Sequence, residues 1–519
     1  MRATLQAWQC HLRVRLVGAS TIAHSSKSSG TRKDPRFSKA DRTTMGNEGI
    51  VLDRTSRVPL QRQLETTLRE AILSGRLEAG ERILSSRELR THLGLSRNTI
   101  VSALSQLHAE GYLVIVQGVG TFVAETVHSR LKGSRNGQTQ REAAPPDTAE
   151  RFLSSHALAG NLSAAVPFRP GIPALDLFPA AQFRRGFKPS EWTPRALDYP
   201  SAFGHERLRE AIVKRLAQTR GIACNADQVL ITSGAQAAFS LIARVLLKRN
   251  DAVIVEEPGY PNARAVFLAE QSRIRAVPVD DDGIVAASLA KYRAKLIHVT
   301  PSHQYPTGAV LSLERRFALL DWAARHDAWI IEDDYDSEFN YTGKPQPALH
   351  SLDGGHRVLY VGTFSKVLSP ALRIAYVVVP RSLRGAFEAA QQVTGGHPSS
   401  IIQNAVATFM ENGHFGRHIT KMRKIYDERR RFASGELARR AGAQIQVRDS
   451  RAGLQFIANL PKPIKDTELS LRAAEKGIIV PALSNYFHGR PTLNGIVVGY
   501  AAIPPSIAKQ AVTMLCECF

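Results

Sequence analysis

The chain has 519 residues, of which 43% are hydrophobic and 22% charged, so we expect a globular protein with at least two domains. Its Lys and Arg exceed its Asp and Glu by 68 − 46 = 22, which indicates either attraction to polyanions or general basicity. No apolar run approaches the ~20 residues of a membrane span, so no membrane association is expected. The four cysteines show no metal or redox spacing, so we expect no metal site and a reducing cytoplasm.

Residues 1–45 are rich in Arg, Lys and Ser and contain two acids, Asp34 and Asp41. They lack the long apolar stretch of a secretion signal. Two explanations fit this composition: an organellar transit peptide, or a start codon assigned too far upstream, since a more ordinary sequence opens at Met45. We expect residues 1–45 to form a disordered basic extension.

Residues 50–125 predict a small domain of three helices and a β-hairpin. The first helix has apolar residues four positions apart, at Leu60, Leu64, Leu68 and Ile72. The run "YLVIVQGVGTFV" that ends the domain predicts two strands joined through a glycine turn.

Between them, two more helices are predicted around a turn at Gly94. Ser85 and Glu88 have capping-box spacing, so the second helix should begin near Ser86, and Ser96 should cap the third. The third helix is expected to turn four apolar residues inward: Ile100, Val101, Leu104 and Leu107.

This domain resembles the GntR family of winged helix-turn-helix proteins across "PLQRQLETTLREAILSGRLEAGERI" and "SSRELRTHLGLSRNTIVSALSQLHAEGYLVIVQGVGTFV". The resemblance implies binding to double-stranded DNA at promoter repeats. The residues it would place against DNA are Arg87, Ser96, Arg97, Asn98, Thr99, Gln117 and Gly118. The alternative interpretation is a solvated helix cap with a charged surface. Residues 51–125 hold nine Arg against eight acids, so binding should depend on placed contacts and dimerisation more than on bulk charge.

Residues 126–155 are polar, interrupted by Gly and Pro, and without periodicity, so we predict a linker. In residues 156–519, helical stretches alternate with β-branched runs: "QVLIT", "AVIVEE", "KLIHVT", "WIIEDD", "VLYVG" and "IAYVVV". This alternation predicts an α/β fold with a mainly parallel sheet covered by helices, followed by a small C-terminal α+β subdomain.

Ligands of such sheets bind at the carboxyl ends of the strands. Three groups follow strands here: the Gly234-Ala235-Gln236 turn, the acidic run Asp333–Asp336, and the segment from Thr363 to Arg373, which includes Lys366. Taken singly, each is weak evidence, because strand-glycine-helix turns are common and acids at a strand end are more often solvated or capping than catalytic. Taken together, they fit one ligand.

Pyridoxal 5′-phosphate (PLP) needs a lysine for a Schiff base, a carboxylate at its ring nitrogen, and backbone, hydroxyl and arginine donors for its phosphate. Lys366 and Asp333 supply the first two groups. The Gly234 turn, Thr363 and Arg373 supply the phosphate donors, with helix N-terminal amides among them. These residues together are therefore interpreted as a PLP site.

From about residue 165 the chain resembles class I aminotransferases of PLP fold type I, and with its GntR-like head it resembles the MocR/GabR family of bacterial regulators. The motifs are "FRPGIPALDLFP", "ITSGAQAAF", "EEPGYPNAR", "TPSHQYPTGAVLS", "EDDYDSEFNY" and "GTFSKVLSPALRIAY". By this resemblance Tyr335 would donate to the ring hydroxyl, Tyr260 would stack on the ring, and Tyr199 would reach a neighbouring subunit's cofactor. The family implies a homodimer at the bacterial nucleoid, with an amine, an amino acid or PLP itself as effector.

Two functions remain open. The preferred one is a PLP-dependent transcriptional regulator; the alternative is an active aminotransferase with a DNA-binding head. Arginines that relatives use for carboxylates are replaced here by Asn262 and Asn494, with Arg490 or Arg264 as substitutes. This replacement argues against efficient transamination and against a GABA-type effector.

Overall fold

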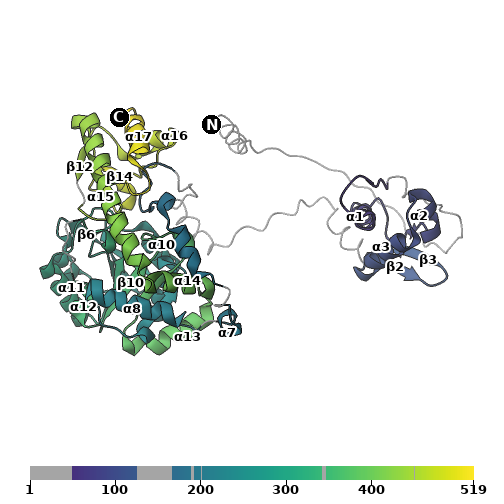
Figure 1. Cartoon of the computed structure of the whole chain (residues 1–519), viewed down its shortest axis with the longest axis horizontal. Helices are drawn as coiled ribbons and strands as arrows, with labels where there is room; N and C mark the ends of the chain where they lie inside the picture. The colour runs from purple at the N-terminus through teal and green to yellow at the C-terminus, as the bar shows by residue number, and fades with distance from the viewer. Residues whose placement is uncertain (1–49, 126–165, 189–191, 200, 342–346, 449–450) are drawn as a thin grey trace, which may run out of the picture. The chain divides into compact units, whose positions relative to one another are not determined.

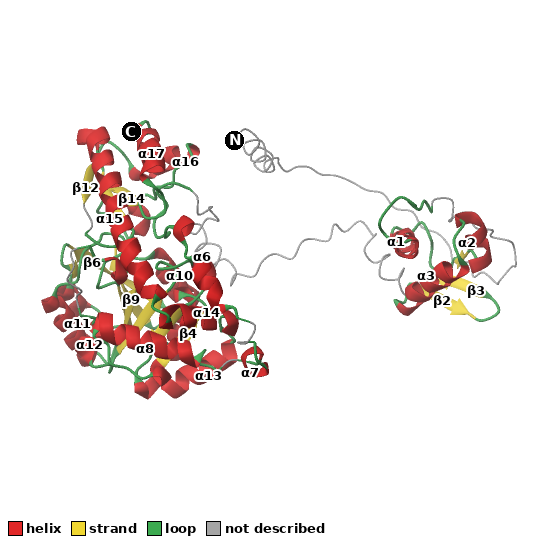
Figure 2. Cartoon of the chain, in the orientation of Figure 1, coloured by secondary structure: helices red, strands yellow, loops and turns green. Residues whose placement is uncertain are grey.

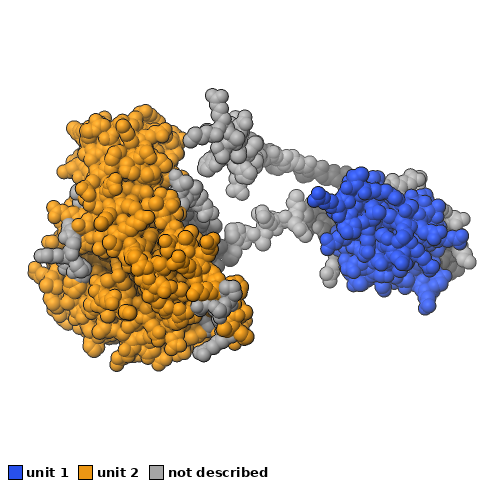
Figure 3. All heavy atoms as spheres, viewed as in Figure 1, with its two compact units in different colours: residues 1–143 blue, residues 144–519 orange. Residues whose placement is uncertain are grey.

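The structure is a computed structural model that describes residues 50–125 and 166–519, apart from 189–191, 200, 342–346 and 449–450. The chain separates into two compact units, residues 1–143 and 144–519 (Figure 3). The predicted extension 1–45 and linker 126–155 lie outside the described residues. Among the helices of the described part, none combines the length and apolarity needed to cross a membrane.

The first unit is a three-helix domain with a small antiparallel sheet, in the strand order β1-β3-β2 (Figure 1). Its elements are α1 (Leu60–Leu73), β1 (Arg82–Ile83), α2 (Ser86–Leu93), α3 (Arg97–Ala109), β2 (Leu113–Val116) and β3 (Gly120–Val123). Leu64, Leu68 and Ile72 of α1 are fully buried, as the four-residue spacing predicts. The fold class predicted for this unit is confirmed.

Local signals fix the helix ends in this unit. Ser85 and Glu88 form the predicted capping box, with Ser85 Oγ accepting from Glu88 N at 3.2 Å and Glu88 Oε2 accepting from Ser85 N at 2.7 Å. Ser96 caps α3 by accepting from Thr99 N at 3.1 Å. Between the helices, Gly94 has a φ of +60°, a conformation that favours glycine.

The prediction that Val101 of α3 belongs to the core is wrong. Val101 is 43% exposed, and Ala103 is buried in its place beside Ile100, Leu104 and Leu107. Ile100, Ala103, Leu104 and Leu107 follow the i, i+3, i+4, i+7 spacing of one helix face, and Val101 falls outside it.

The second unit is built on an eight-stranded sheet in the order β4-β11-β10-β9-β8-β5-β6-β7, in which β11 and β7 run antiparallel to the rest. Figure 2 shows helices lying around the strands of this sheet. The strands are β4 (Val229–Thr232), β5 (Ala252–Glu257), β6 (Arg273–Asp280), β7 (Gly283–Ile284), β8 (Leu296–Val299), β9 (Trp329–Asp334), β10 (Val358–Thr363) and β11 (Ala375–Val378). The sheet is mainly parallel, as predicted.

Helices cover both faces of this sheet. Neighbouring residues Ile330 and Ile331 of β9 belong to different apolar clusters, so each face of the central strand is packed. The α-helices in the described residues of the unit are α6 (Ala180–Phe183), α7 (Pro194–Leu197), α8 (Glu206–Arg220), α9 (Ala235–Leu246), α10 (Pro261–Ala269), α11 (Leu313–Arg325), α12 (Leu349–Asp353), α13 (Arg384–Thr394), α14 (Ser400–Glu411), α15 (His414–Ala441), α16 (Asp466–Glu475) and α17 (Pro505–Cys516).

The predicted C-terminal α+β part contains an antiparallel sheet of β12 (Gln446–Arg448), β13 (Gln455–Asn459) and β14 (Gly495–Gly499). The long helix α15 packs on α17, which closes the chain. The sheet contacts the rest of the unit at β14, where Gly499 N donates to Phe168 O at 2.8 Å. A side chain at Gly499 would meet the backbone of Arg169, so this approach requires glycine.

Candidate functional site

The ends of β9 and β10 open into a cavity of about 360 Å³, a size typical of small-molecule sites. All nine residues predicted to hold a cofactor line it: Gly234, Ala235, Gln236, Tyr260, Asp333, Tyr335, Thr363, Lys366 and Arg373. They come from four separate segments of the chain, which the parallel sheet brings to one edge.

One end of the cavity is a cradle for an anion. Gly234 precedes α9, so the amides of Ala235 and Gln236 belong to the first helical turn, whose N–H groups have no partner within the helix. A Cβ on Gly234 would lie 3.2 Å from Arg373 Nη2, so the absent side chain lets the guanidinium approach the helix start. Arg373 itself has a φ of +51°, which is unusual for a residue other than glycine.

Lys366 lies on the same cavity, and its Nζ donates to Gly171 O at 2.8 Å. Burial lowers the pKa of this amine below its ordinary value of 10.5, although the nearby carboxylates Asp333 and Asp336 oppose the shift. A neutral amine is the nucleophile that an aldehyde requires, so this environment suits Lys366 to carbonyl chemistry.

Asp333 is a buried carboxylate, 5% exposed, at the end of β9. Its Oδ2 lies 3.3 Å from Nε2 of His298, a buried residue of β8 that two phenylalanines contact edge-on. The register places His298 opposite Ile331, so Asp333 lies two residues further on the same face. The interpretation of the acidic run as solvated strand-end acids is wrong, because Asp334 and Asp336 are buried as well.

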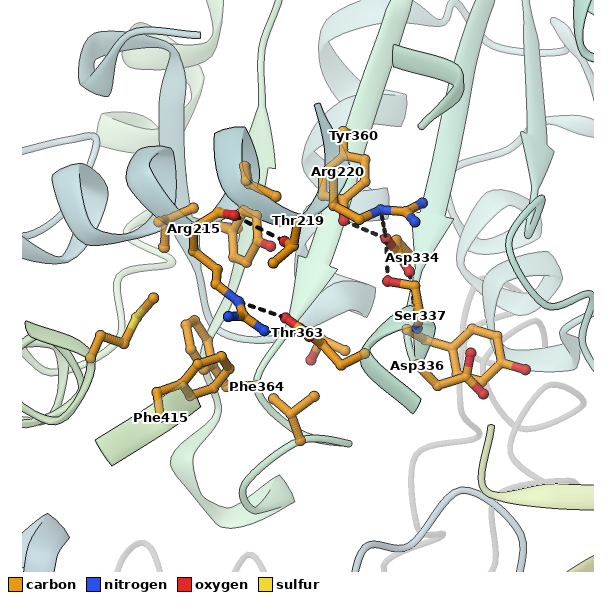
Figure 4. Close-up of a pocket in the computed structure, with 17 residues that line it drawn as sticks. Arg215, Thr219, Arg220, Asp334, Asp336, Ser337, Tyr360, Thr363, Phe364 and Phe415 are labelled. Carbon is orange, nitrogen blue, oxygen red and sulfur yellow. Dashed lines mark hydrogen bonds and ion pairs between the residues drawn. The ribbon is translucent and has the colours of Figure 1, made fainter. Parts of the chain in front are cut away.

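The neighbouring acid, Asp334, faces a second, smaller cavity of about 40 Å³ and is held by three groups. It pairs with Arg220 at 2.9 Å and accepts from Ser337 Oγ at 2.7 Å and from the Tyr360 hydroxyl (Figure 4). Burial alone would lower the pKa of Arg220, but Asp334, Tyr360 and Glu332 raise it above its ordinary value. Asp334 is thus held in a structural ion pair with Arg220, whereas Asp333 lines the larger cavity.

Aromatic side chains form the remaining wall. Tyr260 and Tyr335 both contact Tyr305 edge-on, with ring centroids 5.5 and 5.6 Å apart. Burial raises the pKa of Tyr260 above its ordinary value of 10, so its phenol stays neutral. Sequence reasoning quoted the "SHQYPTG" motif and assigned no role to Tyr305; the aromatic residue inside the motif was the available signal.

The arginines considered as carboxylate readers do not line the cavity. Asn494 Nδ2 instead donates to backbone carbonyls, Ile464 O at 2.8 Å among them, and Arg264 Nη1 donates to Tyr486 O at 3.4 Å. Of the residues lining the cavity, Arg169 and Arg373 are the arginines, and Arg169 was not predicted. Tyr199 is 97% exposed and lies outside the cavity of its own chain.

The residues predicted to meet DNA lie on the surface of the first unit. Arg87, Arg97, Asn98, Gln117 and Gly118 are exposed. Arg97 and Asn98 occupy the first turn of α3, where helix N–H groups and side chains can reach a phosphate or a base edge together. Ser96 is also exposed, and its hydroxyl lies 2.8 Å from that of the half-buried Thr99.

Comparison with known proteins links both units to families. Residues 60–123 match the model "Bacterial regulatory proteins, gntR family", and residues 188–493 match "Aminotransferase class I and II". The probable rhizopine catabolism regulatory protein MocR of Rhizobium meliloti is 35% identical over 91% of this chain and 96% of its own. The chain belongs to the MocR/GabR family.

Other relatives agree with this assignment. The pyridoxine biosynthesis transcriptional regulator PdxR of Corynebacterium glutamicum is 32% identical over 85% of this MocR/GabR-family chain and 91% of its own. The aminotransferase LysN of Thermus thermophilus, solved with N-(5′-phosphopyridoxyl)-L-leucine, matches with a TM-score of 0.65 at 26% identity, over 72% of this chain and 96% of its own. The cofactor of this fold is PLP, and the cavity fits it, because an anion cradle, an amine of lowered pKa and a buried carboxylate lie on one surface.

Proposed function

We propose that this chain is a transcriptional regulator that binds promoter DNA through its winged helix and senses PLP, alone or with an amine or amino acid, through its large unit. The observation that carries the proposal is the presence, in one chain, of an exposed Arg97–Asn98 helix start and a cavity lined by Lys366, Asp333 and Arg373. An enzyme has no need of the first feature.

Each cavity residue has a part in this proposal. Lys366 would hold the cofactor covalently, Asp333 would keep its ring nitrogen protonated, and Tyr260 would pack on its ring. The amides of Ala235 and Gln236, with Thr363 and Arg373, would bind its phosphate. Bound there, the cofactor supplies an electrophilic carbon that reacts with amines.

Where the effector is an amino acid, we propose that its carboxylate binds Arg169. Arg373 lies against Gly234 at the phosphate cradle, whereas Arg169 belongs to the loop that accepts the Lys366 hydrogen bond through Gly171. Arg169 is close enough to Lys366 to act on the pKa of its amine. A carboxylate next to a reacting amine, as in an amino acid, would suit this position.

A homodimer in the bacterial cytoplasm is part of the proposal. Trp192, Leu197 and Tyr199 are 52%, 60% and 97% exposed within one short segment of the large unit, and such side chains are typical of interfaces. Two winged helices in a dimer would bind two DNA half-sites.

The test uses the purified full-length chain and the promoter region upstream of its own gene. We expect a visible absorption band after incubation with PLP, its loss in Lys366→Ala, and promoter affinity that changes when PLP or an amino acid is added. A protein that binds no PLP or no promoter contradicts the proposal. If the chain forms keto acid continuously from an amino donor and does not bind DNA, the alternative function, an active aminotransferase, is favoured. The presence of both Lys366 and Asp333 supports this alternative.

A further inference from the structure

Val101 is an apolar residue on the exposed side of α3 in the first unit. Its side chain is 43% exposed, whereas the buried residues of the same helix are Ile100, Ala103, Leu104 and Leu107. Among the described residues, Val101 is not part of the apolar cluster that forms the core of this unit. Packing inside the domain therefore does not explain why this position carries an apolar side chain.

Helix formation does not explain the valine either. Val101 lies inside α3, away from the cap at Ser96 and from the last helical turn. A β-branched side chain loses rotamer freedom in a helix, and alanine is the more favourable residue at an exposed position. A contact with another molecule gives the side chain a role that neither burial nor helix propensity supplies.

The neighbours of Val101 on the helix surface are the residues proposed to meet DNA. Residues three and four positions apart lie next to each other on a helix, so Asn98 and Arg97 come one turn before Val101. By the same spacing Ser105 comes one turn after it, and all three neighbours are exposed. Val101 therefore extends the DNA-facing start of α3 by one turn.

Short side chains surround this position. Val101, Ser102 and Ser105 are exposed, and each of these side chains ends one atom beyond Cβ. A valine can touch a base only where the helix itself lies deep in the groove, because its side chain reaches a short distance. The major groove of DNA, about 12 Å wide, admits an α-helix, and short neighbouring side chains leave room for that approach.

The major groove offers one apolar group to such a side chain. Thymine presents its C5-methyl group there, whereas the other groups on the base edges are hydrogen-bond donors and acceptors. Valine can neither donate nor accept, so its contact with a polar edge would displace water without replacing the hydrogen bond. The thymine methyl group is therefore the partner that fits Val101.

We propose that Val101 is a specificity-determining residue that packs its methyl groups on the C5-methyl group of one thymine in each DNA site contacted by α3. The inference rests on the proposed promoter binding and adds a base preference to it. Removal of one buried methyl group from the contact should weaken binding about three- to fivefold.

The experiment compares thymine with uracil, which differs from it only by the C5-methyl group. The probes are labelled duplexes from the region upstream of the chain's own gene, limited to the segment that the purified full-length protein protects from nuclease cleavage. Each thymine of this segment is replaced by uracil in turn, and fluorescence anisotropy gives the affinity. We expect a loss of about three- to fivefold at one thymine of each site and smaller effects elsewhere.

Val101→Ala identifies the residue that reads this methyl group. Alanine is a better helix former and the position is exposed, so α3 should fold as before. The variant should bind the unmodified duplex about three- to fivefold more weakly and should no longer distinguish thymine from uracil at the sensitive position. Val58→Ala makes the same deletion at a 47% exposed position before α1, and this control should keep the preference for thymine.

The outcomes separate the two proposals. A wild-type protein that binds none of the duplexes contradicts the proposed function itself. A wild-type protein that binds every uracil-substituted duplex as well as the unmodified one overturns the role of Val101 and leaves the function intact. A sensitive thymine whose replacement weakens Val101→Ala as much as the wild type shows that another residue reads the methyl group, and also overturns the inference.

Discussion

Asp333 and His298 face each other across adjacent parallel strands, with 3.3 Å between Oδ2 and Nε2. The contact orients a buried carboxylate toward the cavity. We predict that Asp333→Asn weakens PLP binding about ten- to hundredfold, because a hydrogen bond to a charged group is lost. Fluorescence titration of the apoprotein with PLP measures this. Asp327→Asn, on the exposed surface, should bind as the wild type does; equal losses in both variants would contradict the assignment.

Arg97 should contribute a placed DNA contact. Arg97→Ala is expected to weaken promoter binding by about 1–3 kcal/mol if the guanidinium pairs with a base. Arg76→Ala removes the same charge from an exposed position between α1 and β1 and is the matched control. Fluorescence anisotropy with a labelled promoter fragment gives both affinities, and similar losses would mean that only bulk charge matters.

Arg169 is predicted to read the effector. Arg169→Ala should abolish the response of the PLP band to amino acids while leaving PLP binding itself largely intact. Arg264→Ala changes an arginine outside the cavity and should respond normally. The absorption band of each variant is titrated with amino acids and with the corresponding amines, which lack the carboxylate. The responses of Arg169→Ala and Arg264→Ala are then compared. An undiminished preference for amino acids in Arg169→Ala would refute this role.

Gly453 should be intolerant of substitution. Gly453→Ala adds a Cβ 2.2 Å from His303 Cε1, in addition to the strain of a positive φ. Gly477→Ala has a similar φ of +77° with nothing within 4 Å of the added atom, so it isolates the backbone strain, about 1–2 kcal/mol. Urea unfolding should show a clearly larger loss in the free energy of unfolding for Gly453→Ala than for Gly477→Ala. Equal losses would mean that the side chains of His303 and Asp336 can move aside at little cost.

His350 is predicted to make stability depend on pH. Burial lowers the pKa of this 2% exposed side chain from 6.5 to about 4. Between these values the unfolded chain binds more protons, so the stabilisation is present above pH 6.5 and is lost as pH falls toward 4, by up to about 3 kcal/mol. His350→Met should lose less stability on acidification. Urea unfolding at pH 7 and pH 4.5 gives the change in the free energy of unfolding for the wild type and for His350→Met. The same change in both proteins would contradict the prediction.

Much of the fold was predictable because its signals are local. The capping box at Ser85, the turn at Gly94 and the β-branched runs each need only a few neighbouring residues. Strand β6 was missed because charged residues, Arg273 and Arg275, alternate with its apolar ones and Pro278 interrupts it. Val101 was misplaced because it falls outside the i, i+3, i+4, i+7 face that begins at Ile100, where Ala103 is the fourth buried residue.

The sequence motifs predicted the residues at the strand ends that line the cavity, but not the buried residues that contact them. The nine predicted residues lie in motifs, whereas His298, His303 and Gln455 contact partners that are 32 to 120 residues away in the sequence. A histidine inside the apolar run "KLIHVT" was a signal that passed unused. Arg54 likewise escaped notice, although its guanidinium donates to Leu93 O and Gly94 O at the end of α2.

The hydrogen bond from Lys366 to Gly171 has a consequence for communication along the chain. If Lys366 held the cofactor covalently, its amine would no longer offer the same protons, and the Gly171 carbonyl would need another donor. Gly171 belongs to the stretch through which the chain enters the large unit after residue 165, on the side of the sequence that leads back to the winged helix. A change of donor at this carbonyl would therefore fall in the part of the large unit that lies closest, along the polypeptide, to the first unit.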